Sequence, residues 1–367
     1  MELSENFRAL FSGDANHTMM PDFWNLSTYN YDLPSELIAQ NPIEPRDCSR
    51  LLTLNRQTGE CAHHHFFDLP DFLREGDLLV LNDTRVFPAR IFGHKIPSGR
   101  KVEILCLAPD PDISNTWHAL VKPGKKLPPG CMVRLSDGSD VTICEYLPDG
   151  VRRVHFPKGK NALALLSKLG EMPLPPYIKN STAPAERYQT IYSDPDKTGS
   201  AAAPTAGLHF TEPLFDRLSK KGVGVEYITL NVGLGTFRPV KVADIREHTL
   251  HSEICEIGEE TALRIMKTKK SGRRIIAVGT TVVRTLESFA REDGFLQNGL
   301  VSTNIFIHPG YSFKMIDGMV TNFHLPQSTL LMLVAAFGGY APVMEAYRKA
   351  VEERYRFFSF GDAMLIL

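Results

Sequence analysis

The chain has 367 residues, enough for one large domain and a smaller one. Hydrophobic residues make up 43% of the sequence and charged residues 23%, which is typical of a globular protein with a hydrophobic core. The 41 Lys and Arg balance 42 Asp and Glu, so the net charge excludes a general attraction to nucleic acid but not a local basic groove.

The pattern of cysteines and apolar residues argues against disulfide-rich, zinc-binding, membrane-spanning and secreted proteins. The six cysteines are dispersed without a CxxC pair, which argues against a disulfide framework or a zinc site and favours the reducing cytoplasm. The longest apolar run, Leu330–Phe337, is too short to cross a bilayer. The amino terminus lacks a basic start followed by an apolar core, so we expect no signal peptide.

Residues 1–26 are predicted to be a loosely ordered extension. The following SELIAQ predicts a short helix that ends before Asn41, because a residue preceding proline resists the helical conformation. A strand is expected at Leu51–Leu54. The run His63–His65 is interpreted as a strand edge and not as a metal site, because alternation sends the middle imidazole to the opposite face.

Residues 76–156 differ from the segments on either side in their sequence pattern, with short β-rich runs separated by turns such as KPGKKLPPG and PDG. Many short strands at this spacing predict a small antiparallel barrel or sandwich. We therefore predict a compact all-β domain inserted into an α/β domain made of residues 27–75 and 157–367. Its first turn holds Asp83 and Arg85, which fit either an Asx turn or an arginine that binds phosphate or carboxylate.

The stretch Ser200–Phe215 combines small residues, a turn and a histidine. Small residues let a backbone approach a ligand, and Gly207 has access to backbone angles closed to other residues. A helix capped by Thr211 is expected to follow, so unpaired N–H groups lie near the turn. His209 is therefore a candidate acid, base or hydrogen-bond donor. The alternative is a tight strand-to-helix turn with a satisfied histidine.

Strands and helices alternate over the rest of the chain. Strands are expected at 223–231, 274–279 and 320–323, with a final one within 357–367. Each of the first three precedes or follows a helical pattern, and the last helix is expected at 342–355. This alternation indicates an α/β domain whose function lies at the carboxyl ends of its strands.

Two polar segments after the strand at 223–231 are candidate site loops. The GxG of Gly233 and Gly235, followed by Thr236, lacks the third glycine of a dinucleotide fingerprint but suits close approach to a ligand. His248 and His251, with the nearby Glu253, resemble half of a metal site. Three ligands within six residues seldom complete a metal shell, so a polar active-site loop is the preferred interpretation.

Further polar loops follow the later strands. Thr280, with Arg284 one turn on, marks either an anion site at a helix start or plain capping. The loops at 204–209, 233–238 and 322–324 are expected to converge with this one on a single rim. The resulting pocket of His, Thr, Asn, Arg and Glu suits acid–base and electrostatic work on an organic substrate. The basic run 267–274 is either a solvated helix end or a phosphate contact.

Ten sequence blocks, in order, carry a specific resemblance to a known family. They are YDLPSELIAQNPIEPRDCSRLL, LLVLNDTRVFPARIFG, GEMPLPPYI, ERYQTIY, AAPTAGLHFT, TLNVGLGTFRPV, HTLHSE, IAVGTTVVRTLES, TNFHLPQSTLLMLVAAF and YRFFSFGDAMLI. Over about residues 27–367 the chain resembles the S-adenosylmethionine:tRNA ribosyltransferase-isomerases of queuosine biosynthesis.

The resemblance implies a fold and a reaction. The fold is α/β, with a larger α/β-barrel-like domain interrupted by a small all-β barrel domain. The reaction transfers the ribosyl part of S-adenosylmethionine to 7-aminomethyl-7-deazaguanine at the tRNA wobble position and isomerises it, giving epoxyqueuosine-tRNA with release of adenine and methionine. S-adenosylmethionine is consumed as a substrate, so no cofactor and no metal is expected. We also expect a cytoplasmic monomer whose partner is tRNA.

Residue roles follow from the loops that match the family, as hypotheses. Proton transfer is assigned to His209 and His324, with assistance from Glu253. The substrate-binding residues are expected to be Asp83, Arg85, Thr205, Gly207, Gly233, Gly235, Thr236, His248, His251, Thr280, Arg284 and Asn322. Two rival functions are a conventional RNA methyltransferase, which would form S-adenosylhomocysteine, and a non-catalytic tRNA-binding module, which would need an obvious basic stripe.

Overall fold

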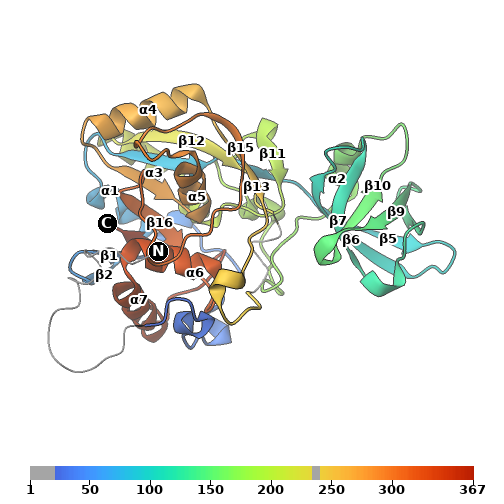
Figure 1. Cartoon of the computed structure of the whole chain (residues 1–367), viewed down its shortest axis with the longest axis horizontal. Coiled ribbons are helices and arrows are strands. Elements are labelled where there is room, and N and C mark those ends of the chain that lie inside the picture. Colours follow the sequence, from blue (N-terminus) through green and yellow to red (C-terminus); the bar gives the residue numbers. More distant parts are fainter. Residues whose placement is uncertain (1–20, 234–239) are drawn as a thin grey trace.

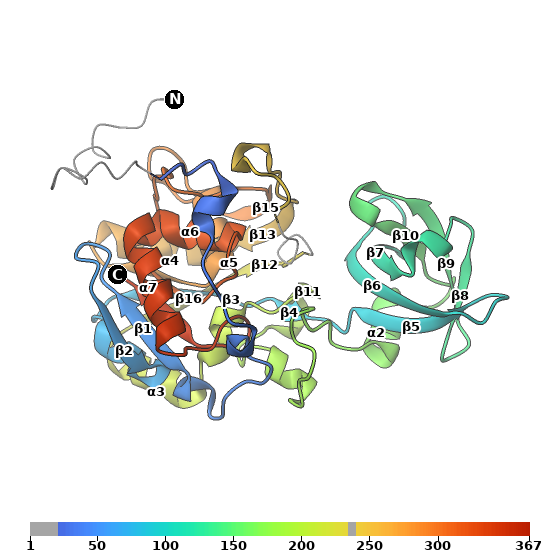
Figure 2. The ribbon, with the colours of Figure 1, turned by 90° about the horizontal axis from the view of Figure 1, so that it is seen from below.

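The computed structural model describes residues 21–233 and 240–367, which form two units of different architecture (Figure 1). The larger unit is built on a nine-stranded sheet with helices on both faces. The smaller unit is a closed barrel of six strands. Figure 2 shows the barrel as a separate lobe beside the larger unit.

The strands of the large sheet come from both ends of the chain. They lie in the order β15, β13, β12, β3, β14, β16, β17, β1, β2. Their bounds are β1 (Arg50–Leu54), β2 (Cys61–His65), β3 (Leu78–Asn82), β12 (Gly224–Leu230), β13 (Glu253–Ile257), β14 (Ile275–Val278), β15 (Gly299–Thr303), β16 (Gly318–Asn322) and β17 (Ala363–Ile366).

The centre of the sheet is parallel. Strands β12, β3, β14 and β16 pair as parallel neighbours. The sequences of β3, β14 and β16 are LLVLN, IIAV and GMVTN, and every residue in them is buried. Near-continuous apolar runs suit a parallel sheet that is covered on both faces. The parallel direction also brings four carboxyl ends to the same edge of the sheet.

Helices cover both faces of this sheet because side chains alternate along each strand. Leu78 and Val80 of β3 pack in a core shared with α4 to α7, whereas Leu79 and Leu81 pack in a core shared with α1 and α3. The helices are α1 (Leu69–Phe72), α2 (Ala162–Leu169), α3 (Glu212–Lys220), α4 (Glu259–Lys270), α5 (Thr280–Phe289), α6 (Thr329–Gly338) and α7 (Tyr340–Glu352). The predicted α/β class is confirmed.

The smaller unit has its own hydrophobic core. Its strands are β5 (Arg90–Lys95), β6 (Lys101–Pro109), β7 (Thr116–Lys122), β8 (Met132–Leu135), β9 (Asp140–Tyr146) and β10 (Arg152–His155). Alternate residues of β6 point inward and join a core to which α2 adds Ala162, Leu165 and Leu166. The side chain of Asn161 caps α2 by accepting a hydrogen bond from the Ala164 N–H. The inserted all-β barrel is thus confirmed.

Three details of the expected architecture are corrected. Strand β3 falls within the predicted insert of residues 76–156, but it lies at the centre of the large sheet, where the apolar run Leu78–Leu81 is buried on both faces. Helix α2, expected in the α/β domain, packs on the barrel. The large sheet is also not barrel-like, because within the described residues β15 and β2 are its two open edges.

Other segments differ less from the expectation. The SELIAQ segment forms only a single 3-10 turn, Ser35–Leu37, and His63–His65 lies in the edge strand β2, as expected.

Within residues 21–233 and 240–367, no cluster of three or more His, Cys, Asp or Glu is arranged to hold a metal ion. No single described helix is long and apolar enough to cross a membrane; α6 and α7 reach that length only together, bent by 117° at their break.

Candidate functional site

A cavity of about 440 Å³ lies at the carboxyl ends of β12, β14 and β16. Its wall is built from residues 202–206, 279–281 and 321–328, with Val232 and Val240 beside them. Three of the loops expected to converge therefore do so. The fourth, 233–238, lies largely outside the described residues, including the candidates Gly235 and Thr236, but the residues that flank it line the cavity.

Four of the predicted site residues line this cavity. They are Thr205, Thr280, Asn322 and His324. The segments that hold them are a 3-10 helix, η11 (Thr205–His209), the start of α5 and the end of β16 with the loop that follows. A concave site with a few convergent polar groups in an otherwise apolar wall is the usual form of a small-molecule site.

Asn322 presents a hydrogen-bond acceptor that none of the described residues uses. Its Nδ2 donates to the Phe358 carbonyl oxygen at 3.0 Å and lies 3.3 Å from the His209 Nε2. The Phe358 carbonyl can only accept, so the amide orientation is fixed with Oδ1 as the remaining group. This buried Oδ1 has no partner among the described residues, and the side chain lines the cavity. An unsatisfied buried acceptor is rare, so this oxygen is a candidate for a ligand contact.

His209 lies behind Asn322 and not at the surface of the large cavity. Its Nδ1 is 2.7 Å from the Ser49 Oγ, and its Nε2 accepts from Asn322. Both ring nitrogens are therefore engaged by protein. Burial lowers the pKa of His209 to about 4, so the ring is neutral near pH 7. The geometry gives His209 the role of orienting Asn322, which differs from the expected direct proton transfer.

His324 is the one histidine of the expected catalytic set that lines the large cavity. Its Nε2 is 2.8 Å from the Thr321 Oγ1, and its backbone N–H donates to the Tyr347 Oη at 3.0 Å. These contacts fix the ring and the backbone. Burial lowers the pKa of His324 to about 3, so this ring is also neutral near pH 7.

Glu253 and Arg284 form a buried ion pair beside the large cavity. The Glu253 Oε2 pairs with the Arg284 Nη1, while Oε1 accepts from the Gly233 N–H at 3.1 Å. The pair lines a recess of about 20 Å³ that also contains His251 and shares Leu330 with the large cavity. Because both carboxylate oxygens are engaged, this arrangement holds the strand end at Gly233 in place.

Four further predicted site residues, besides His209 and those around the Glu253–Arg284 pair, also lie outside the large cavity. Asp83 accepts from the Thr229 Oγ1 at 2.7 Å, and burial raises its pKa. Arg85 donates to the Ser193 Oγ at 3.0 Å. It lies in β4 (Arg85–Val86), which pairs with β11 (Thr198–Ser200) where the chain leaves the sheet for the barrel. The other two, Gly207 and His248, are also held by packing contacts.

Gly207 is required by packing and not by a ligand. A Cβ at this position would lie 1.9 Å from the Tyr192 Oη, so only glycine lets η11 pack against that ring. His248 is half-buried against Phe306, with ring centroids 5.8 Å apart, and burial lowers its pKa. The expectation that these residues contact substrate is therefore not supported by their positions.

The start of α5 supplies backbone groups at the cavity wall. Gly279 caps the helix with φ of +93° and ψ of 152°, a conformation essentially restricted to glycine. Gly279, Thr280 and Thr281 all line the cavity. The first N–H groups of a helix have no partner within the helix, and its dipole is positive at this end. An anionic group is the natural ligand here.

Sequence reasoning missed several residues of the site. Tyr177 and Ser359 line the cavity and lie 2.7 Å apart through their oxygens, although they are 182 positions apart in sequence. Ser49 holds His209 from a distance of 160 positions. Tyr177 lies in the GEMPLPPYI block and Ser359 in the YRFFSFGDAMLI block, so the family resemblance itself was the signal that could have identified them.

Comparisons with known proteins cover almost the whole chain. The family described as queuosine biosynthesis protein matches residues 26–366. The S-adenosylmethionine:tRNA ribosyltransferase-isomerases of Symbiobacterium thermophilum and Natranaerobius thermophilus are 54% and 50% identical to it, each over 93% of this chain and 99% of the relative. The crystal structure of S-adenosylmethionine tRNA ribosyltransferase from Thermotoga maritima is 38% identical, with a TM-score of 0.53, over 93% of this chain and 100% of that one.

These matches include a solved structure as well as sequences, and they extend over both the sheet and the barrel. The ten sequence blocks therefore reflect common descent and not a shared local motif. The chain is an enzyme that belongs to the S-adenosylmethionine:tRNA ribosyltransferase-isomerase family of queuosine biosynthesis.

Proposed function

We propose that this enzyme transfers the ribosyl moiety of S-adenosylmethionine to 7-aminomethyl-7-deazaguanine at the wobble position of tRNA and isomerises it to the epoxycyclopentane of epoxyqueuosine. Adenine and methionine leave. The observation that carries the proposal is the cavity beside Asn322, because its volume of about 440 Å³ lies in the range typical of small-molecule sites. S-adenosylmethionine is a consumed substrate, so the proposal needs no cofactor or metal, and the enzyme acts as a cytoplasmic monomer.

The start of α5 binds the methionine carboxylate. Its N–H groups and the Thr280 hydroxyl face an anion without requiring a cationic side chain. This matters because the same substrate carries a sulfonium, whose charge a nearby lysine or arginine would oppose. The buried Asn322 Oδ1 accepts a hydrogen bond from a hydroxyl or amine of the substrate.

His324 carries the proton in this proposal. The sulfonium acidifies the adjacent 5′ carbon, and a neutral imidazole accepts the proton released there. Burial holds the pKa of His324 at about 3, so the ring is neutral before reaction and does not repel the sulfonium. The protonated ring then passes the proton to the departing adenine.

The Glu253–Arg284 pair stabilises the backbone beside the large cavity. By holding Gly233, it fixes the backbone that follows β12, next to Val232 in the cavity wall. The aminomethyl nitrogen of the tRNA base gives up a proton to the imidazole, which is neutral again after protonating adenine, and attacks the ribose carbon that adenine has left. Methionine is the second leaving group, released from the 5′ carbon as the new ring closes.

Product analysis tests the function directly. The enzyme is mixed with S-adenosylmethionine and tRNA carrying 7-aminomethyl-7-deazaguanine, and the small molecules and the tRNA nucleosides are quantified. We expect adenine and methionine in equal amounts, matched by modified tRNA, and no release with tRNA that has guanine at the wobble position. Formation of S-adenosylhomocysteine would instead identify a methyltransferase and overturn the proposal.

A further inference from the structure

The near-neutral chain divides into two units of opposite charge. Residues 90–170, which span the barrel and α2, contain thirteen Lys and Arg but only seven Asp and Glu, a net charge of +6. The rest of the chain has 28 basic and 35 acidic residues, a net charge of −7. An overall balance therefore conceals a strongly basic lobe on an acidic body.

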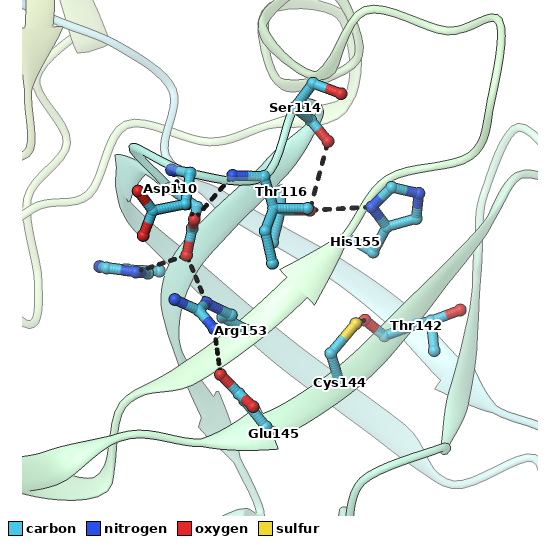
Figure 3. Close-up of polar contacts among 11 residues, drawn as sticks. Asp110, Ser114, Thr116, Thr142, Cys144, Glu145, Arg153 and His155 are labelled. Carbon is cyan, nitrogen blue, oxygen red and sulfur yellow. Dashed lines mark hydrogen bonds and ion pairs between the residues drawn. The ribbon is translucent and has the colours of Figure 1, made fainter.

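Ion pairs within the barrel consume most of its acidic residues. Figure 3 shows Arg153 held between Asp110 and Glu145, and His118 adds a second contact to Asp110 at 2.9 Å. Other described pairs engage three more carboxylates: Arg90 and Lys122 pair with Glu103, Arg134 with Asp140, and Lys160 with Asp137. The excess positive charge consequently resides on the other basic side chains.

Four of these basic residues gather at one site: Lys95, Lys125, Lys126 and Arg152. Together with Tyr146 they form what we term the barrel basic patch. The Lys95 Nζ donates to the Lys126 carbonyl oxygen at 2.9 Å, in η7 (Gly124–Lys126). A Cβ on Gly124 would lie 3.9 Å from the Arg152 Nη2, so Arg152 lies directly under this turn. In the described part of the chain, none of the four cations has a carboxylate within 4 Å.

An exposed aromatic ring completes the patch. The Arg152 guanidinium carbon lies 3.9 Å from the centroid of the Tyr146 ring, and the two residues are cross-strand neighbours. Tyr146 is nevertheless 52% exposed. A ring fixed by a cation underneath and open to solvent above is a platform on which an unpaired base can stack. Lys125 and Lys126 are exposed on the turn beside it and can reach phosphates.

The topology places this lobe on the same edge of the sheet as the cavity. The chain enters the barrel from the carboxyl end of β3, where the Asn82 Nδ2 lies 3.3 Å from the Thr281 Oγ1 at the cavity wall. The other basic segment, Lys267–Lys270, ends α4 just before β14 begins, so it lies at the opposite edge. Lysines in a last helical turn are also explained by the helix dipole alone.

We propose that the barrel basic patch binds the tRNA, with Lys125 and Lys126 contacting backbone phosphates and Tyr146 stacking on a base outside the cavity. This rests on the proposed function, because a cavity of about 440 Å³ has room for S-adenosylmethionine and a base but not for the rest of a tRNA. The patch supplies the missing contact through charge and stacking, which are the two means by which proteins hold flexible RNA.

Salt-dependent binding of tRNA to the full-length enzyme tests the patch. The variant Lys125→Ala/Lys126→Ala should weaken tRNA binding on the order of tenfold at physiological salt, and reduce the slope of log affinity against log salt by about 1.4 to 1.8, the value for two phosphate contacts. Tyr146→Ala should weaken binding severalfold and leave the slope unchanged. The matched control Lys267→Ala/Lys270→Ala removes the same charge from the opposite edge and should bind as the wild type does.

Binding and reaction are measured separately so that each proposal has its own outcome. Wild-type affinity and slope in the Lys125/Lys126 variant, with ribosyl transfer intact, would overturn the patch and leave the function standing. Patch-dependent tRNA binding without release of adenine by the wild type would support the patch and overturn the function. S-adenosylmethionine binding should be unchanged in all the variants, and a parallel loss of it would show damage to the fold and overturn the assignment of the lysines to tRNA.

Discussion

At the scale of single residues, Asn322 connects the protein interior to the cavity. Its amide hydrogens are engaged by Phe358 and His209, and its oxygen has no partner among residues 21–233 and 240–367. A buried acceptor that meets a ligand donor contributes about 1–3 kcal/mol through the cost of leaving that donor unpaired. This value corresponds to roughly 5- to 150-fold in affinity.

We therefore expect Asn322→Ala to weaken S-adenosylmethionine binding by that factor, measured by titration calorimetry. The control Asn298→Ala changes an exposed asparagine and should bind with wild-type affinity. Circular dichroism of both variants would verify that the fold is intact. Unchanged affinity in a folded Asn322→Ala protein would mean that the substrate does not use this oxygen.

His209 acts through Asn322 if its role is to position that amide. Glutamine at this position retains an acceptor of similar reach, whereas leucine does not. We expect His209→Gln to keep most of the activity and His209→Leu to lose S-adenosylmethionine affinity about tenfold, the size of one buried hydrogen bond. A proton-transfer role would predict equal losses of kcat in both variants, so steady-state kinetics separates the two.

The same histidine makes stability depend on pH. Burial lowers the pKa of His209 from 6.5 to about 4, so between these values the unfolded chain binds more protons than the folded protein. Stability is then lost as pH falls through this window. At about 1.4 kcal/mol per pKa unit, this group alone lowers the free energy of unfolding by about 2 kcal/mol between pH 7 and pH 5.

Urea unfolding at the two pH values measures this effect. His209→Gln should lose about 2 kcal/mol less than the wild type between pH 7 and pH 5, as the linkage relation requires. His65→Gln, at an exposed position, should lose as much as the wild type. Equal losses in all three proteins would show that acid sensitivity originates elsewhere.

At the scale of elements, the start of α5 combines strain with function. Gly279 has φ of +93°, and a Cβ there would contact the Ala206 side chain at 3.5 Å. A non-glycine residue in this region of backbone space costs about 1–3 kcal/mol. We expect Gly279→Ala to destabilise the protein by this amount and to weaken S-adenosylmethionine binding, because the first N–H groups of α5 are displaced.

Gly294 offers a matched control. It also has positive φ, +78°, but a Cβ there would meet nothing within 4 Å. Gly294→Ala should therefore cost stability without changing affinity, with both quantities measured by thermal unfolding and calorimetry. If the two variants bind S-adenosylmethionine equally well, the start of α5 is not part of the binding site.

The elements also show how far sequence patterns reach. Apolar runs predicted the strands β12, β14 and β16 and the helices that follow β14 and β16, because a buried parallel sheet leaves a local signature. The same signature could not assign β3 to the large sheet instead of the barrel, because the partners of a strand are determined by contacts with residues far along the chain.

Long-range contacts also limited the prediction of the site. The converging loops were predicted from strand ends, and Thr280, Asn322 and His324 do line the cavity. The contact between Ser49 and His209 joins residues 160 positions apart, and no periodicity records it. A histidine that orients an amide and a histidine that faces a cavity are therefore indistinguishable in sequence.

At the scale of the whole molecule, the sheet and the barrel have separate cores. The barrel core contains residues only from Phe87 to Leu169, and the large-sheet cores contain none of them. Cooperative unfolding follows shared packing, so the two units should unfold as two transitions. Only the larger unit is expected to bind S-adenosylmethionine, because the cavity is lined by residues outside the barrel.

Calorimetry with and without ligand tests this division. Ligand at 100 times its dissociation constant stabilises the unit that binds it by about 2.7 kcal/mol, so one transition should move upward and the other should stay. Ile143→Ala, in the barrel core, should lower only the ligand-insensitive transition, and Leu286→Ala, in α5, only the ligand-sensitive one. A single transition that moves as a whole in every case would mean that the junction couples the units, and that ligand bound at the sheet also stabilises the basic lobe.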